Sequence, residues 1–293
     1  MSTRLPPSCP TSEAGIHEHW AEIEGHRMRF LHGGTGPPLL LVHGLLGYSF
    51  SWRFNLPVLA KRFTVFAPDL LGAGFSDRVP GMDCSMAAIA GRLLQFLRGQ
   101  GIEVFDLLGT SHGGAIAMML AALAGQNNPS AVRRLILVDP AHPWSRPRPI
   151  LIKLLSRRAG AALFRASLPV IRLTREHYLR RMYGDPRRIS PGTAEGYKAG
   201  LASRKAYEYP LSIVRCWQED MRKLEAALPR IAGIPTLLMW GSRDRVILPR
   251  TAAQLQRQFR NCRLLILEGV GHLPYEETPE EFNRAVLEFL ESD

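Results

Sequence analysis

A serine between two glycines is the first feature of the sequence that could do chemistry. Residues 109–113 read Gly-Thr-Ser-His-Gly, a G-x-S-x-G pattern with Ser111 at its centre. The pattern follows an apolar stretch typical of a strand and opens a stretch typical of a helix, which makes the serine the tip of a sharp, strained turn. The first turn of the helix places partial positive charge beside the hydroxyl. The sequence therefore predicts that Ser111 is a nucleophile.

A nucleophilic serine needs a base, and the base needs an acid that orients it. His272 lies in a glycine-bracketed loop directly after the last predicted strand, and Asp244 directly follows the strand before it. Functional groups gather where the carboxyl ends of parallel strands meet. We therefore expect Ser111, Asp244 and His272 to form a catalytic triad. Asp139, which follows another predicted strand, is the rival acid.

A second glycine-containing loop could stabilise negative charge on the substrate. His43-Gly44 leaves the first buried strand, and the loop continues to Gly47. Such a loop can aim a backbone N–H group at an oxyanion, together with the N–H group of the residue after the nucleophile. The expected donors are the N–H groups of Leu45 and His112, and we expect the His43 side chain to brace the loop.

These residues require a scaffold of strands that alternate with helices. Six apolar runs predict buried strands, and four segments with helical spacing lie among them. Two further strands are expected between residues 20 and 31, with a turn near Gly25. The runs cover residues 39–42, 63–67, 104–108, 135–138, 236–240 and 263–267, and the helical patterns cover 87–98, 114–123, 249–259 and 279–290. This order predicts an α/β protein with a mostly parallel central sheet flanked by helices.

The alternation stops in the middle of the chain. Residues 141–230 contain helical patterns and no convincing strand, so we expect residues 1–140 and 231–293 to form one core that carries an all-helical insertion. Four aromatic residues of the insertion are candidates for binding a substrate: Trp144, Phe164, Tyr183 and Trp217.

Composition narrows the class of protein. The 293 residues are 46% hydrophobic and 22% charged, which is ordinary for a globular domain. We find neither an apolar run that could span a membrane nor an apolar segment typical of a secretory signal near the start. Four widely spaced cysteines form no CxxC pair, so we expect reduced thiols and a cytoplasmic location.

The net charge of +11 is concentrated in the insertion. Residues 142–230 contain 19 Lys and Arg but 7 Asp and Glu, whereas the rest contains 18 and 19. Apolar residues interspersed with basic ones over residues 149–183 could contact the anionic inner face of a membrane. The alternatives are a helix packed on the core with a solvated arginine face, or an anionic ligand. We expect no nucleic acid partner, because no recognition motif accompanies the charge.

The motifs together resemble the α/β-hydrolase fold superfamily over about residues 20–290. The matching residues are His43-Gly44, residues 69–76 (D-x-x-G-x-G-x-S), the turn at Ser111, residues 241–244 and Gly271-His272. The resemblance implies that residues 141–230 are a cap over the site, and that residues 69–76 are mainly structural, with Ser76 a turn residue. Epoxide hydrolases and haloalkane dehalogenases of this superfamily place an aspartate where this chain has Ser111, so neither activity is expected.

The expected function is hydrolysis of carboxylic esters, with hydrophobic acyl groups, through an acyl-enzyme on Ser111. A small-molecule acyl ester is thus the expected substrate, with no metal and no organic cofactor. Two alternatives remain open at this point. One is a C–C bond hydrolase acting on a vinylogous diketone acid, whose negative charge would suit the arginines of the insertion. The other is a non-catalytic member of the fold that binds a ligand in its pocket or a partner on its surface.

Overall fold

The structure is a computed structural model that describes residues 15–145, 162, 166 and 175–292. An eight-stranded sheet runs through its centre in the order β1-β2-β4-β3-β5-β6-β7-β8. Pairing is antiparallel from β1 to β2 and from β2 to β4, and parallel from β4 to β8. The strands are β1 Ile16–Ile23, β2 His26–Gly33, β3 Pro38–Val42, β4 Thr64–Pro68, β5 Phe105–Thr110, β6 Val132–Val138, β7 Thr236–Gly241 and β8 Cys262–Leu267. The predicted fold class is confirmed.

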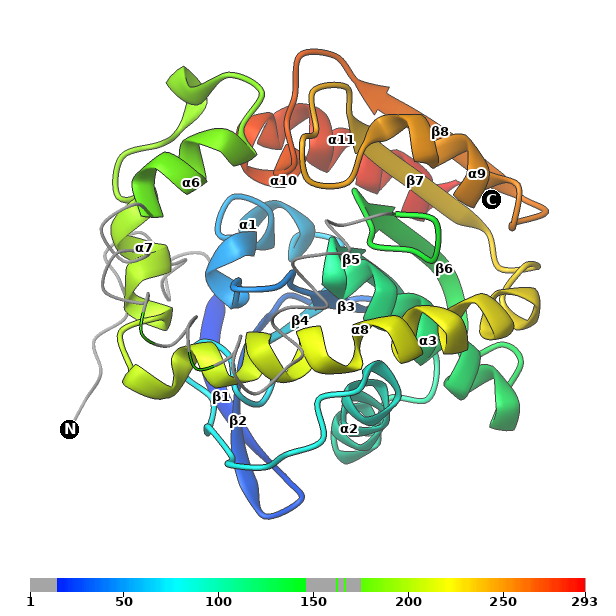
Figure 1. Ribbon diagram of the computed structural model, residues 1–293. Helices are drawn as coiled ribbons and strands as arrows, with labels where there is room; N and C mark the ends of the chain where they lie inside the picture. Colours follow the sequence, from blue (N-terminus) through cyan, green and yellow to red (C-terminus); the bar gives the residue numbers. More distant parts are fainter. Residues whose placement is uncertain (1–14, 146–161, 163–165, 167–174, 293) are drawn as a thin grey trace.

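Helices cover both faces of the sheet (Figure 1). One face packs against α2 (Met86–Gly99), α3 (His112–Asn127), the inner side of α8 (Glu208–Ala227) and α9 (Ala252–Gln256). The other packs against α1 (Leu56–Leu59), α10 (Pro274–Glu277) and α11 (Pro279–Glu291). The central strands β3 and β5 are therefore buried on both sides, which is why their sequences are apolar without alternation.

The described residues between β6 and β7 form helices and contain no strand. These helices are α6 (Arg175–Met182), α7 (Thr193–Gly200) and α8, with short 3₁₀ turns η3 (Pro186–Arg188), η4 (Arg204–Tyr207) and η5 (Leu228–Arg230). Two further 3₁₀ turns lie elsewhere, η2 (Ser49–Trp52) and η6 (Pro249–Thr251). The helical character expected for this part of the chain is thus seen where the structure describes it. The division into core and cap stays a prediction, and Phe164 lies outside the described residues.

A buried ion pair of the core accepts hydrogen bonds from two tyrosines of the middle segment. Arg53, after η2, contacts both carboxylate oxygens of Glu276 on α10 at 2.9 and 3.0 Å. Tyr183 donates its hydroxyl to Glu276 at 2.7 Å, and Tyr197 on α7 donates to the same carboxylate. Both charged side chains are almost fully buried, so the bidentate pair and its phenol donors compensate for lost hydration.

Glu276→Ala is expected to lower the free energy of unfolding by about 3–5 kcal/mol, because it leaves the Arg53 charge buried without its partner. Urea unfolding of the variant and the wild type measures the change. Glu219→Ala is the matched control, since Glu219 pairs with Arg222 on the exposed face of α8, where such pairs contribute about 0–1 kcal/mol. Equal losses in the two variants would contradict the structural role given to Glu276.

Candidate active site

Ser111 occupies the turn between β5 and α3 in a strained conformation. Its backbone angles, φ 53° and ψ −124°, lie in a region where residues other than glycine rarely occur. The turn is tight, because a Cβ atom on Gly113 would lie 2.3 Å from the carbonyl oxygen of His43, and one on Gly109 would lie 2.4 Å from that of Gly113. Both glycines of the pattern are thus required by close backbone contact, and Ser111 is left half-buried at the sheet edge.

Asp244 and His272 are directly hydrogen-bonded. His272 Nδ1 donates to Asp244 Oδ2 at 2.7 Å, and both side chains are buried. The other carboxylate oxygen, Oδ1, accepts the N–H groups of Val246 at 2.6 Å and Ile247 at 3.1 Å. Because Nδ1 carries the proton, Nε2 of the imidazole is left as an acceptor. This is the tautomer that a general base for a serine hydroxyl requires.

Ser111 belongs to the same edge of the sheet as this pair. It follows β5, while Asp244 and His272 follow β7 and β8, which are parallel to β5. Among the described residues, no hydrogen bond joins Ser111 Oγ to His272. Catalytic hydrogen bonds are often long or poorly aligned without substrate and shorten in the complex. The structure thus joins His272 to Asp244 and places Ser111 at the same edge of the sheet.

The loop after β3 lies directly against the serine. A Cβ atom on Gly44 would be 3.2 Å from Ser111 Cβ and 3.8 Å from Oγ. Within the described part of the chain, the backbone N–H groups of Leu45 and His112 make no hydrogen bond. Two free donors beside the serine are what an oxyanion-binding site needs.

The loop is braced by His43, as expected. Its Nε2 accepts the N–H group of Leu70 at 3.1 Å, and its Nδ1 lies 2.9 Å from the carbonyl oxygen of Gly44. Burial lowers the pKa of His43 below its usual value, which keeps the ring neutral and both hydrogen bonds in place. His43 therefore connects the Gly44 loop to the segment after β4.

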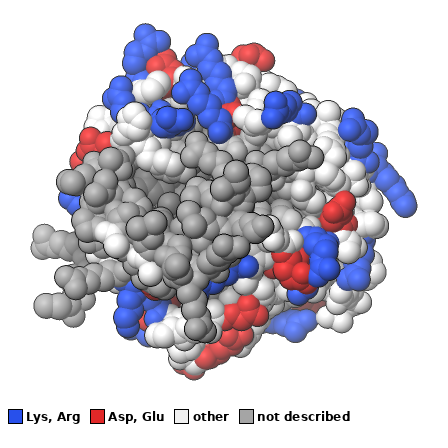
Figure 2. Space-filling model, in the orientation of Figure 1, with Lys and Arg blue, Asp and Glu red and all other residues white. Residues whose placement is uncertain are grey.

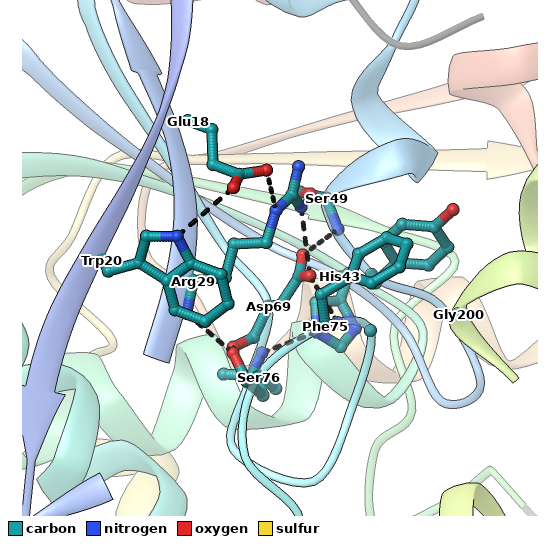
Figure 3. A network of polar contacts seen from close by, with 12 residues as sticks. Glu18, Trp20, Arg29, His43, Ser49, Asp69, Phe75, Ser76 and Gly200 are labelled. Atoms are coloured by element: carbon teal, nitrogen blue, oxygen red, sulfur yellow. Dashed lines mark hydrogen bonds and ion pairs between the residues drawn. The ribbon is translucent and has the colours of Figure 1, made fainter. Parts of the chain in front are cut away.

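That segment is held by a buried network around Asp69 (Figure 3). Asp69 accepts the N–H groups of Ser49 at 2.8 Å and Phe75 at 2.9 Å, and its Oδ2 lies 3.1 Å from the Arg29 guanidinium. Ser76 donates its hydroxyl to the Asp69 carbonyl at 2.6 Å. These contacts support the expectation that the D-x-x-G-x-G-x-S segment is structural, since its serine is occupied in a turn.

Aromatic side chains pack near the residue that follows Ser111. The His112 ring stacks on Trp217 of α8, with centroids 5.8 Å apart. Burial lowers the pKa of His112 to about 3, so this ring stays neutral at physiological pH. Trp144 is half-buried beside His142, with centroids 5.9 Å apart. Tyr183 lies in the opposite core cluster with its hydroxyl bound to Glu276, a position that gives it a packing role.

The buried ring of His142 is expected to make the free energy of unfolding depend on pH. Its ring is buried between Trp144 and Trp240, Nε2 lies 2.9 Å from the Thr251 hydroxyl, and burial lowers the pKa to about 4. The unfolded chain binds a proton near pH 6.5 whereas the folded chain resists it until about pH 4. The free energy of unfolding should therefore decrease as the pH falls from 6.5 to 4, with His142 accounting for about 2 kcal/mol at pH 5.

Urea unfolding at pH 7.5 and pH 5 tests this expectation. In His142→Phe, which keeps the aromatic packing, the loss of stability between the two pH values should be smaller than in the wild type. His17→Gln, a change on the exposed part of β1, serves as the control and should leave the difference unchanged. A His142→Phe variant with the full wild-type pH dependence would contradict the assignment.

Asp139, which directly follows β6, lies at the same edge of the sheet. Asp139, Asp244 and His272 are all buried, and their potential ligand atoms lie within 4.8 Å of one another. The spacing of these atoms is compatible with a metal ion. The Asp244 oxygens, however, already accept three N–H groups, and His272 Nδ1 is used as a donor. The donor set fits a hydrogen-bonded relay better than a metal centre.

Comparison with known proteins identifies the family. The family described as alpha/beta hydrolase fold matches residues 37–279, and the chain therefore belongs to it. Haloalkane dehalogenase 2 of Mycobacterium tuberculosis is 28% identical over 93% of this chain and 94% of its own length. Lipase 1 of Psychrobacter immobilis is 29% identical over 88% of this chain and 78% of its own.

A solved structure extends the likeness to the whole fold. Cfl2 from Burkholderia cenocepacia superposes with a TM-score of 0.84, at 22% identity, over 96% of this chain and 98% of that one. The proteins to which this chain is similar therefore include one named as a haloalkane dehalogenase and one named as a lipase.

Proposed function

We propose that the protein is a serine hydrolase that cleaves carboxylic esters with hydrophobic acyl groups. The observation that carries the proposal is the 2.7 Å hydrogen bond between His272 Nδ1 and Asp244 Oδ2, formed at the sheet edge where Ser111 is strained. Membership of the alpha/beta hydrolase fold family and the similarity to a lipase support it.

In the first half of the reaction, Ser111 Oγ attacks the ester carbonyl while His272 Nε2 accepts its proton. The Asp244 carboxylate stabilises the imidazolium that forms. The oxyanion of the tetrahedral intermediate accepts hydrogen bonds from the free N–H groups of Leu45 and His112. Collapse of this intermediate transfers the proton from His272 to the leaving alcohol and leaves an acyl group on Ser111.

In the second half, His272 removes a proton from a water molecule that attacks the acyl-enzyme. The same two N–H groups stabilise the second oxyanion, and the proton returns to Ser111 as the acid departs. The chemistry depends on the serine hydroxyl as nucleophile. The superfamily's dehalogenases and epoxide hydrolases form an ester on an aspartate at this position, so the similarity to a dehalogenase does not carry that activity to this chain.

The preference for hydrophobic acyl groups rests on the two tryptophans that remain candidates for the pocket. Trp217 stacks on His112, which directly follows the nucleophile, and Trp144 packs beside His142 after β6. Both are half-buried and present apolar surface to the same side of the sheet as α3. Of the other two candidates, Phe164 lies outside the described residues, and the Tyr183 hydroxyl is hydrogen-bonded to Glu276.

Hydrolysis of p-nitrophenyl esters from acetate to palmitate tests the proposal. We expect turnover with an optimum above acetate, and an acyl group on the Ser111 peptide when the reaction is quenched and analysed by mass spectrometry. A dienoic keto-acid in the same panel tests the C–C hydrolase alternative, whose signature is turnover of that compound and of no ester. Absence of turnover on all compounds would leave the ligand-binding alternative.

Contact with an anionic membrane stays a prediction. Figure 2 shows Lys and Arg side chains gathered at the edge of this face where α6 and η3 lie. The exposed arginines there are Arg180, Arg181, Arg187 and Arg188. No helix within the described ranges is long and apolar enough to cross a membrane. Sedimentation with anionic and with neutral vesicles, using glutamine at these four positions as the comparison, tests a peripheral contact.

A further inference from the structure

Asp139 lies beside the Asp244–His272 pair in a strained and fully buried position. Its φ is 42°, in the left-handed region, and its side chain has no exposed surface. The backbone is held there by the hydrogen bond from the Asp139 N–H group to the Met239 carbonyl oxygen at 2.9 Å. Strain of this kind persists where the surroundings determine it, and it clusters at functional sites.

The two carboxyl groups are provided with unequal numbers of donors. Asp244 accepts three N–H groups, from Val246, Ile247 and His272. Asp139 accepts one, from Gly241 to Oδ1 at 3.0 Å. Its other oxygen, Oδ2, is buried and has no hydrogen-bond donor in the part of the chain that the structure describes. An ionised carboxylate needs donors on both oxygens, so the negative charge is favoured on Asp244.

Oxygens of the two carboxyl groups lie within 4.8 Å of each other in a buried site, which disfavours a negative charge on both groups. Among the described residues that interact with Asp139, Asp244, Glu277 and Tyr275 are negative or neutral groups, and the His272 proton is donated to Asp244. Burial and the neighbouring Asp244 raise the pKa of Asp139 well above its usual range. A proton on Asp139 Oδ2 removes the repulsion and turns the atom without a partner into a donor.

We propose that Asp139 is a neutral carboxylic acid that donates a hydrogen bond from Oδ2 to the Asp244 carboxylate and thereby positions it toward His272. Asp139 is a positioning residue, and its role rests on the proposed function because Asp244 and His272 must activate Ser111. The bond supplies a fourth donor to the charged carboxylate and delocalises its charge. It also gives a role to an aspartate that occupies a strained backbone position.

Two substitutions of Asp139 separate the donated hydrogen bond from the backbone conformation. Asp139→Asn keeps an oxygen for the Gly241 N–H group and places an amide N–H where the acid has its O–H, and asparagine tolerates a positive φ. Asp139→Gly accepts the same φ without strain and removes both hydrogen bonds. The rate at which a fluorophosphonate probe labels Ser111 measures nucleophile activation without assuming a natural substrate.

Asp139→Asn is expected to be labelled at close to the wild-type rate with the same pH profile. Asp139→Gly should be labelled about tenfold more slowly, since a hydrogen bond to a charged group is lost. Its acid limb should move to higher pH, because Asp244 without its donor stabilises the protonated imidazole more strongly. Loss of activity in Asp139→Asn as large as in Asp244→Asn would overturn the proposal, and so would an Asp139→Gly variant with an unchanged rate and profile.

Infrared spectroscopy observes the proton directly and does not depend on catalysis. At pH 8, the difference spectrum between the wild type and Asp139→Asn should contain the carbonyl band of a protonated carboxylic acid. Asp220→Asn is the matched control, because Asp220 is buried away from the site and its pKa, raised to about 6 by burial, leaves it ionised at this pH. A difference spectrum for Asp139→Asn without the band would overturn the proposal.

Probe labelling tests the activation of Ser111, whereas the infrared band tests the proton on Asp139, so the two proposals can fail separately. If the wild type is not labelled by the probe, the proposed function fails, while the infrared band still decides whether Asp139 carries a proton. If Asp244→Asn retains labelling and Asp139→Asn loses it, the roles of the two carboxyl groups are reversed and the positioning role is wrong.

Discussion

Ser111→Ala is expected to lower kcat for ester hydrolysis by roughly 10⁴- to 10⁶-fold, because no acyl-enzyme can form. The remaining rate comes from binding and from the N–H groups of Leu45 and His112, which act on the carbonyl without the nucleophile. KM should change little, since alanine removes one oxygen from a half-buried position. Steady-state kinetics on the best ester of the panel measures both parameters.

Ser130→Ala is the matched control for this prediction. Ser130 is exposed in the turn before β6 and its replacement should leave kcat unchanged. Mass spectrometry provides the second readout, since the acyl group seen on the wild-type Ser111 peptide must be absent in Ser111→Ala. Ester turnover that survives in Ser111→Ala would show that another group attacks the substrate, and the proposed mechanism would be wrong.

His272→Ala is the second prediction with a large effect, a decrease in kcat of roughly 10⁴- to 10⁶-fold. In the proposed mechanism the imidazole acts as base in both halves of the reaction, and no other described histidine ring is hydrogen-bonded to a carboxylate in this way. His272→Gln is the informative partner variant, because it keeps an amide donor for Asp244 and lacks a basic nitrogen. Both variants should lose activity together, which separates base catalysis from side-chain packing.

A double variant makes the prediction sharper. In the proposed mechanism Ser111 and His272 act as one unit, so Ser111→Ala combined with His272→Ala should lose hardly more activity than either change alone. The free energies of activation would then be strongly non-additive. Additive losses would mean that the two residues act independently, and the proposed transfer of the Ser111 proton to His272 would be wrong.

The strands were predictable from the sequence where burial on both faces requires apolar residues throughout. Strands β3 and β5 are apolar throughout because helices cover both faces. The prediction was less accurate for β6, which begins at Val132, three residues before the predicted start. Arg133 and Arg134 interrupt the apolar pattern there, and the Arg133 guanidinium pairs with buried Asp106 on the neighbouring β5. A strand whose charge is compensated by another strand cannot be recognised from its own residues.

The helical segment after β7 shows a second limit. A single helix was expected over residues 249–259, whereas the chain forms the 3₁₀ turn η6 and then α9, which ends at Gln256. The chain then leaves the helix, since the Arg260 N–H group bonds to the carbonyl of Ala232 at 2.8 Å. That contact joins residues far apart in sequence, so local periodicity gave no sign of it.

In the candidate site too, features that are local in sequence were predictable and contacts between distant segments were not. Ser111, Asp244 and His272 were identified because each follows a strand end, a relation that is local in sequence. The proximity of Asp139 to both Asp244 and His272, and the engagement of Tyr183 by Glu276, depend on how β6, β7 and α10 pack. The only signal for Asp139 in the sequence was its position after a strand at the same edge. That position suggested Asp139 as an alternative to Asp244, but gave no sign that the two carboxyl groups lie together.

The segment after α6 has a consequence for exchanging parts between relatives. His272 donates its backbone N–H group to the carbonyl of Met182 at 2.6 Å, and a Cβ atom on Gly184 would lie 2.2 Å from the carbonyl oxygen of Gly269. Glu277 accepts the N–H groups of both Gly184 and Gly271. A chimera that replaces residues 141–230 as one unit would therefore also replace the backbone carbonyl that holds His272, the proposed base. Grafted segments should keep residues 182–185, so that substrate selectivity can change while the geometry of His272 is inherited.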